Sequence, residues 1–165
     1  MKKFINFIGL VFLVLLLGCS DPVQEELLTY INDDLAELGE LEGEAIGTYD
    51  SVTGANYTDD FVLYDALTLE IIPIYLEFIG ELESVEISSS ELREIHENYI
   101  DAANNQHIAF TKLVAALENQ DANAIEEVNS MLAESRKMMR QYNYDLQELA
   151  EKHNVEIGDK VEEAM

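Results

Sequence analysis

The chain has 165 residues, of which 34 are Asp or Glu and 9 are Lys or Arg, for a formal net charge of −25 at pH 7. A surface this acidic repels nucleic acid and anionic lipid headgroups, which argues against both as binding partners. The length suits one domain with its own hydrophobic core.

The first 20 residues have the layout of a secretory signal. Lys2 and Lys3 form a short basic start, and residues 4–17 form an apolar run with a single polar member, Asn6. This run is shorter than the roughly 18 apolar residues that a bilayer crossing requires. A small residue, Gly18, then precedes Cys19, the single cysteine of the chain.

The sequence LLGC at 16–19 resembles the lipobox of bacterial lipoproteins, in which an aliphatic residue, a loosely specified one and Gly or Ala precede Cys. The resemblance covers residues 1–20. It implies that the signal is cut between Gly18 and Cys19 and that the Cys19 thiol carries a diacylglyceryl group. Two acyl chains suffice for stable membrane anchoring. The alternative is an uncleaved hydrophobic anchor with an incidental cysteine.

The predicted mature chain, 19–165, keeps 7 basic residues against 34 acidic residues, a formal charge of −27. The imbalance is uneven, since residues 20–92 hold 19 acidic residues and no Lys or Arg. One explanation is adaptation of an outside-facing protein to salty or alkaline surroundings, where ions screen the repulsion. The other is attraction for cations or for a basic partner.

Apolar residues that recur every three or four positions predict helices at about 22–52, 59–85, 89–118 and 122–153. Local start signals agree with these ranges: Pro22 suits a first helical position, Thr58 or Asp59 and Asp121 suit caps, and Ser88 with Glu91 fits a capping box. Residues 155–165 are polar, and we expect this tail to fray.

Four helices of about 30 residues with short connections predict an all-α fold, an antiparallel up-down-up-down four-helix bundle over 22–154 on a tether of residues 19–21. When the sequence is folded about its turns, side chains of similar size fall at the same heights. One level holds Leu28, Leu82, Leu92 and Leu149, and another holds Tyr75, Tyr99 and Tyr142. The tyrosines could form a cage for a cation, or a core layer with hydroxyls at its edge.

The same folding places four polar side chains at one level of the bundle: Glu42, Thr68, Gln106 and Ser135. Buried polar groups need partners, so one interpretation is a hydrogen-bonded layer that fixes the register of the helices. The other is a mid-bundle cavity that binds a small polar or cationic ligand. Pro73 lies within two turns of this layer and is expected either to kink its helix or to divide it.

Glycines at 39, 43 and 47 form one ridge of the first predicted helix. At 100° per residue the ridge lies well away from the core-facing residues, so we do not expect close helix packing through it. Each Gly costs about 1 kcal/mol relative to Ala in a helix interior. We therefore interpret residues 39–47 as a soft segment of the helix, with a cavity wall or a docking groove as alternatives.

The titratable residues form no recognisable catalytic or metal-binding pattern. His96 and His107 are eleven positions apart, about 16 Å along a helix, which is too far to share one metal ion. We expect both of them and His153 to be surface or flanking residues. With no nucleophile–base pair and no phosphate-binding or zinc motif, we expect neither enzymatic activity nor a cofactor or metal.

Arg136, Lys137 and Arg140 form the one basic cluster of the chain. In the predicted bundle the fourth helix lies beside the first, so we expect these residues to pair with Glu37, Glu40, Glu42 and Glu44. A site for an anionic partner is the alternative.

Together these features predict a lipid-anchored protein on the extracytoplasmic face of the cell membrane, acting as an accessory or interaction protein of the envelope. Up-down topology on a short tether directs the loop around Tyr57 away from the membrane, and this is where we expect a protein partner. The alternative function is small-ligand or cation binding in the polar layer.

Overall fold

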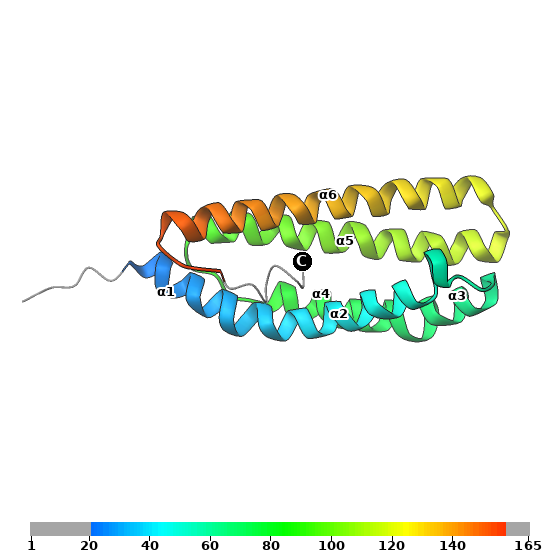
Figure 1. Ribbon diagram of the computed structural model, residues 1–165, viewed down its shortest axis with the longest axis horizontal. Coiled ribbons are helices and arrows are strands. Elements are labelled where there is room, and N and C mark those ends of the chain that lie inside the picture. Colours follow the sequence, from blue (N-terminus) through cyan, green and yellow to red (C-terminus); the bar gives the residue numbers. More distant parts are fainter. Residues whose placement is uncertain (1–20, 158–165) are drawn as a thin grey trace, which may run out of the picture.

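The computed structural model describes residues 21–157, and the predicted signal and lipidation site at Gly18 and Cys19 lie outside this range. Every element in it is helical, with no strand between residues 21 and 157. An all-α fold of four helical stretches is therefore confirmed. Figure 1 shows α5 and α6 side by side, with the first two stretches next to each other below them.

The first stretch comprises α1 (Pro22–Thr29), a π-helical turn η1 (Tyr30–Asp34) and α2 (Leu35–Ser51). A short 3-10 turn, η2 (Gly54–Asn56), leads to the second stretch. This stretch comprises α3 (Asp60–Ala66), the π-helical turn η3 (Leu67–Ile71) and α4 (Ile72–Ser84). Two unbroken helices follow, α5 (Ser90–Asn119) and α6 (Ala122–Lys152).

Side-chain caps explain where the helices begin. The Asp21 carboxylate accepts the Val23 N–H, Asp59 accepts the N–H groups of Phe61 and Val62, and Asp121 caps α6 in the same way. The α5 cap is Ser89 rather than the predicted Ser88. Ser88 has another partner, because its N–H and that of Ser89 donate to the carboxylate of Glu26 on α1.

The π turn η3 lies directly before Pro73. A proline has no N–H and its ring clashes with the carbonyl of residue i−4, here Leu69. A π turn admits one extra residue and carries the chain past this obstacle, so the second stretch stays helical from Asp60 to Ser84. Pro73 then occupies the first turn of α4, where a missing N–H is harmless.

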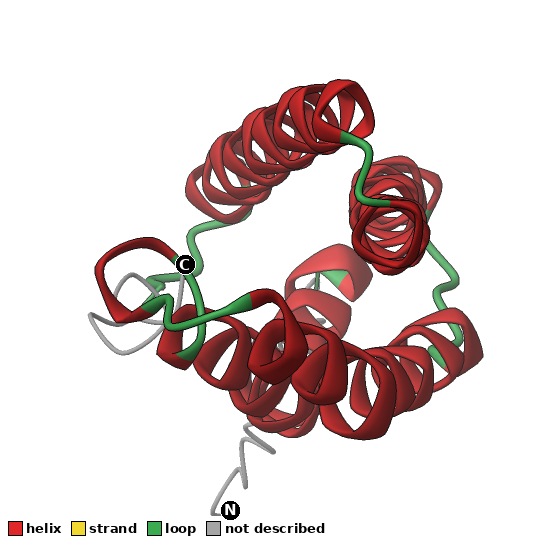
Figure 2. Ribbon diagram, turned by 90° about the vertical axis from the view of Figure 1, so that its right-hand side faces the viewer, coloured by secondary structure: helices red, strands yellow, loops and turns green. Residues whose placement is uncertain are grey.

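The core follows the shared interior of the four stretches, which Figure 2 shows end on. α2 packs on α4 and η3, α4 packs on α5, and α5 packs most extensively on α6. Both helices bury small residues, among them Ala102, Ala109 and Ser135, and Ser135 of α6 accepts a hydrogen bond from Asn105 of α5.

The inward face of the first stretch differs from the prediction at its start. Leu28 was expected in the core but is exposed, whereas Leu27, Tyr30 and Ile31 are buried. Adjacent residues of a helix are about 100° apart, so Leu27 and Leu28 could not both face inward. Tyr30 shares a face with Leu27 because the two are three positions apart.

Residues 155–165 were expected to fray, but the described part of this tail, residues 155–157, packs against the core. Asn154 adopts a left-handed conformation with φ 56°, and the Val155 N–H returns to the carbonyl of Ala150. This is a left-handed helix C-cap. Val155 is buried and Ile157 packs against the core, so the chain turns back over the bundle after α6 (Figure 1).

Candidate functional site

The interior of the bundle contains a chain of hydrogen-bonded polar side chains. The Tyr142 hydroxyl lies 3.0 Å from the Tyr30 hydroxyl, which lies 3.0 Å from Nδ1 of His96. Nε2 of His96 lies 3.0 Å from the carbonyl oxygen of Leu82. All three side chains are buried, and the chain links α6, η1, α5 and the end of α4. Four separate stretches thus share one set of hydrogen bonds.

The direction of each proton in this chain follows from its fixed end. A carbonyl oxygen only accepts, so Nε2 of His96 donates to Leu82, whose carbonyl lies in the last turn of α4 and otherwise accepts only a long bond of 3.4 Å from the Val85 N–H. In neutral His96 the other nitrogen accepts, and the Tyr30 hydroxyl donates to it. Tyr142 then donates to Tyr30. Every N–H and O–H in this network has an acceptor only when His96 is neutral, because a protonated His96 would leave one hydroxyl proton without one.

The electrostatic surroundings agree with a neutral imidazole. Burial lowers the pKa of His96, and the Leu82 carbonyl and the carboxylates of Glu97 and Asp34 oppose this only in part. Burial likewise raises the pKa of Tyr142 and Tyr30 far above the ordinary tyrosine value. The phenols therefore keep their protons, and both nitrogens of His96 are engaged. This set of hydrogen-bonded side chains therefore offers no free base or nucleophile to a substrate.

A half-buried carboxylate lies next to this chain. The Tyr99 ring stacks on Tyr142 with centroids 4.4 Å apart, and the Tyr99 hydroxyl donates to Oε2 of Glu42 at 2.7 Å. Burial raises the pKa of Glu42, and the bond from Tyr99 offsets part of that effect. Glu42 also contributes to the raised pKa of Tyr75, whose buried hydroxyl has no partner among the described residues.

The three core tyrosines pack as aromatic neighbours rather than as an open cage. Tyr75 contacts Phe78 and Phe110 with centroids 5.2 Å and 5.4 Å away, and Tyr99 stacks on Tyr142. Their ring faces are thus covered by other rings, which leaves little room for a cation on them.

Substitution of Tyr75 and Tyr99 by Phe provides a matched test of which tyrosine hydroxyl stabilises the core. Tyr75→Phe removes a hydroxyl that is buried without a partner, and we expect the free energy of unfolding to rise by about 1 kcal/mol. Tyr99→Phe leaves the Glu42 carboxylate without its donor, and we expect a loss of about 1–3 kcal/mol at pH 7. Urea unfolding of both variants measures the difference. Equal effects of the same sign would contradict the assignment.

The four residues of the predicted polar layer have separate partners, and no hydrogen bond within residues 21–157 joins any two of them. Thr68 donates to the carbonyl of Tyr64 in its own helix, and Glu42 accepts from Tyr99. Ser135 is buried and accepts from Nδ2 of Asn105 at 2.8 Å. Gln106, one position further on, is half-buried. Asn105 is therefore the polar partner that the sequence pattern missed.

The interpretation of the histidines as surface or flanking residues is wrong for His96, which is 4 % exposed. The inward face of α5 includes His96, whereas its neighbour Ile95 is half-buried. His107 is half-buried, and His153 is the C-cap of α6. In the part of the chain that the structure covers, no three His, Cys, Asp or Glu side chains cluster as metal ligands would.

The predicted ion pairs of the basic cluster with the first helix are also absent from the described residues. Lys137 pairs instead with Glu134 of its own helix at 3.0 Å, while Arg136 and Arg140 make no ion pair within residues 21–157. Arg136 lies close enough to Tyr49 of α2 to lower its pKa slightly, against the larger opposite effect of burial. The main packing partners of α2 are α4 and η3 rather than α6, which agrees with the missing pairs.

We therefore expect replacement of Arg136, Lys137 and Arg140 by Gln to change the free energy of unfolding by less than about 0.5 kcal/mol, because one exposed ion pair contributes little. Thermal melts in low and high salt provide the measurement. A loss confined to low salt would indicate cross-helix pairing after all.

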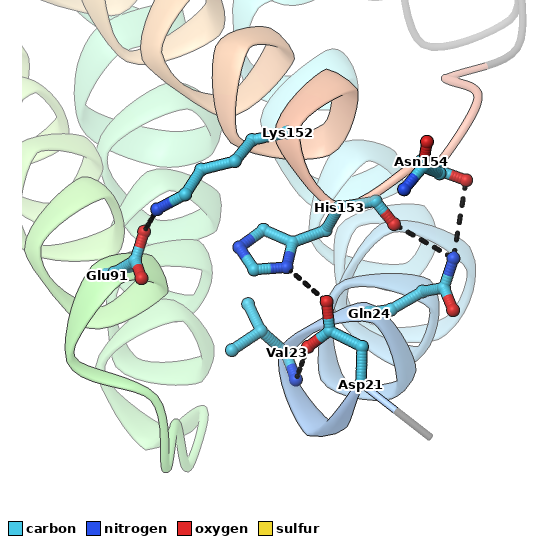
Figure 3. A network of polar contacts seen from close by, with 7 residues as sticks. All are labelled: Asp21, Val23, Gln24, Glu91, Lys152, His153 and Asn154. Atoms are coloured by element: carbon cyan, nitrogen blue, oxygen red, sulfur yellow. Dashed lines mark hydrogen bonds and ion pairs between the residues drawn. The ribbon is translucent and has the colours of Figure 1, made fainter. Parts of the chain in front are cut away.

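A second polar network lies at the end of the bundle where the described chain begins (Figure 3). Oδ2 of Asp21 lies 2.6 Å from Nδ1 of His153, and Nε2 of Gln24 donates to the carbonyl of His153 at 2.8 Å. The hydrogen bond from His153 is the main reason why the pKa of Asp21 is lowered. Lys152 forms an ion pair with Glu91 at the start of α5. The start of α1 is thereby fastened to the end of α6.

Two surface hollows occupy opposite ends of the bundle. One of about 650 Å³ lies between α1 and the start of α5, with Val23, Glu26 and Ser89 in its wall. The other, of about 300 Å³, lies between the end of α5 and the start of α6, near Lys112 and Glu127. Neither is lined by a residue of the predicted polar layer, so neither provides the mid-bundle ligand cavity.

Comparison of the chain with family models, with curated proteins and with solved structures gives no match. Among residues 21–157, no helix combines the length and the hydropathy that a membrane crossing requires. The surface and the sequence of the first 20 residues are therefore the features that bear on function.

Proposed function

We propose that this protein is a lipid-anchored, non-enzymatic interaction protein on the extracytoplasmic face of the cell membrane. Cys19 carries the anchor, and the four helical stretches form an antiparallel up-down-up-down bundle on it. Contacts between distant segments support this topology. Asp21 meets His153 and Glu26 meets Ser89 at one end, whereas Tyr64 meets Glu118 at the other.

The network of Figure 3 supports an upright orientation, because it begins two residues after Cys19. Asp21 caps α1 and contacts His153, so little free chain separates the bundle from the predicted anchor. With 30 residues, α5 is about 45 Å long. The loop around Tyr57 then projects about that far from the membrane.

The observation that carries the interaction role is an apolar patch at this distal end, formed by Tyr57, Phe61 and Val62. These side chains are 47 %, 72 % and 40 % exposed. Exposed apolar residues are normal one at a time, but a group of them at a loop and helix start is typical of a protein contact. A partner that covers this patch would also meet the carboxylates of Asp59 and Asp60.

The test uses the full chain in native membranes with a photo-crosslinking amino acid at Phe61. We expect a defined cross-linked product at Phe61 and none when the crosslinker replaces exposed Glu25 at the opposite end. Equal labelling at both positions, or none at Phe61, would overturn the interaction role.

The anchor has a separate test. We expect mass spectrometry of the detergent-extracted protein to show a chain that begins at Cys19 with an attached diacylglyceryl group. Detection of the intact chain from residue 1, without lipid, would instead establish an uncleaved anchor.

A further inference from the structure

The outer face of the second helical stretch carries exposed apolar residues along much of its length. Leu69 is 71 % exposed and Leu76 is 49 % exposed, although both belong to a helix packed on its other side. Leu69, Pro73, Leu76 and Gly80 follow one another at intervals of four, three and four, so they lie on one face of the helix. We call these four residues the Leu69 face. All four are exposed.

The core does not account for this face. The inner side of the same stretch is complete, since Leu67, Ile71, Tyr75, Phe78 and Leu82 are fully buried. A Cβ added at Gly80 would meet no atom within 4 Å, so no other part of residues 21–157 covers this position. Pro73 and Gly80 lack long side chains and would let another backbone approach closely. The Leu69 carbonyl also lacks its usual donor, because residue i+4 is a proline.

A row of carboxylates runs beside the Leu69 face. Glu70, Glu77 and Glu81 each follow a residue of the face by one position, about 100° around the helix, and all are exposed. None of the three makes an ion pair within residues 21–157, and no Lys or Arg occurs between residues 20 and 92. A second copy bound through the same face would bring two acidic rows together, and anionic lipid would be repelled. An apolar surface with basic flanks is the complementary partner.

We propose that the Leu69 face binds an amphipathic helix of a partner protein, with Lys or Arg residues beside its apolar side. Such a helix buries its apolar residues between Leu69 and Leu76 and places its cations against Glu70, Glu77 and Glu81. This inference rests on the proposed interaction role and specifies the surface and the chemistry of the partner.

The experiment uses a synthetic helical peptide of about 18 residues, made of Leu and Lys with all leucines on one face. A peptide of the same composition in permuted order, without an apolar face, measures purely electrostatic attraction. With residues 19–165 of the protein we expect the first peptide to bind at least tenfold more tightly. The variant Leu69→Ser with Leu76→Ser should lose this preference, because it removes the apolar contact but no charge.

The control variant, Ile108→Ser with Tyr144→Ser, removes two apolar residues that are exposed on α5 and α6 and should keep the preference. Circular dichroism melts check that both variants fold. Equal binding of both peptides, or an unchanged preference in the Leu69/Leu76 variant, would overturn the proposal. Two further results would also overturn it. One is a dimer, seen by sedimentation, that the Leu69/Leu76 variant abolishes, and the other is binding to lipid vesicles that the same variant abolishes. Cross-links at Phe61 with no peptide preference would refute this inference and leave the interaction role intact.

Discussion

Replacing His96 with Phe is expected to lower the free energy of unfolding by about 2–4 kcal/mol. The variant keeps a ring of similar size but leaves one hydroxyl proton of the Tyr30–Tyr142 pair without an acceptor, and a buried unsatisfied group costs about 1–3 kcal/mol. It also removes the donor from His96 to the Leu82 carbonyl, which keeps only its long bond from the Val85 N–H. Urea unfolding at pH 7.5 measures the loss. The control is His107→Phe, at a half-buried position without a hydrogen-bonded ring. A similar loss in both variants would show that the hydrogen bonds of His96 add little.

The same residue makes stability depend on pH. The folded pKa of His96 is lowered by burial, whereas the unfolded chain titrates near 6.5. The unfolded state therefore binds more protons below that pH, and stability falls as the pH drops from about 6.5 toward the lowered folded pKa. The difference in unfolding free energy between the native chain and His96→Gln should shrink over this interval. A difference independent of pH between 7.5 and 5 would contradict a neutral buried His96.

Replacing Gly39, Gly43 and Gly47 with Ala is expected to stabilise the protein by about 1.5–3 kcal/mol, which corresponds to roughly 5–10 °C in Tm. All three lie within the regular helix α2, and a Cβ at any of them meets no atom within 4 Å. The substitutions therefore add helix propensity without a clash.

The control for the glycine series is Gly54→Ala. Gly54 has φ +56°, which an L side chain adopts only at a cost of about 1–2 kcal/mol, so this variant should be less stable. A triple variant that gains nothing would contradict the view that helix propensity alone decides the effect of these three positions. Hydrogen exchange over residues 39–47, compared with α5, tests separately whether this segment is soft.

Local signals in the sequence located the starts of the helices well, because a capping group acts over a short distance. Pro22, Asp59 and Asp121 act through groups two or three residues away, so their effect does not depend on the rest of the fold. The first stretch was predicted at about 22–52 and is helical over 22–51. The two π turns had no comparable signal, apart from Pro73 beside the second.

The polar interior was harder to predict because it depends on helix rotation. Gln106 was expected to face inward and His96 to lie at the surface, but the structure buries His96 and pairs Asn105, one position before Gln106, with Ser135. One position is about 100° of rotation, which apolar spacing alone resolves poorly in a helix rich in alanine. Tyr30 was missed in the same way. Its clue was its spacing of three from Leu27.

The junction of Asp21 and Gln24 with His153 has a mechanical consequence for a chain held at Cys19. A force applied at Cys19 would act on α1 and α6 together, because Asp21 and Gln24 join the start of α1 to His153 at the end of α6. Peeling α1 away would first require several contacts to break at once, including the carboxylate of Glu26 on the N–H groups of Ser88 and Ser89. Force applied at the anchor would thus be shared across the base of the bundle instead of opening it one turn at a time.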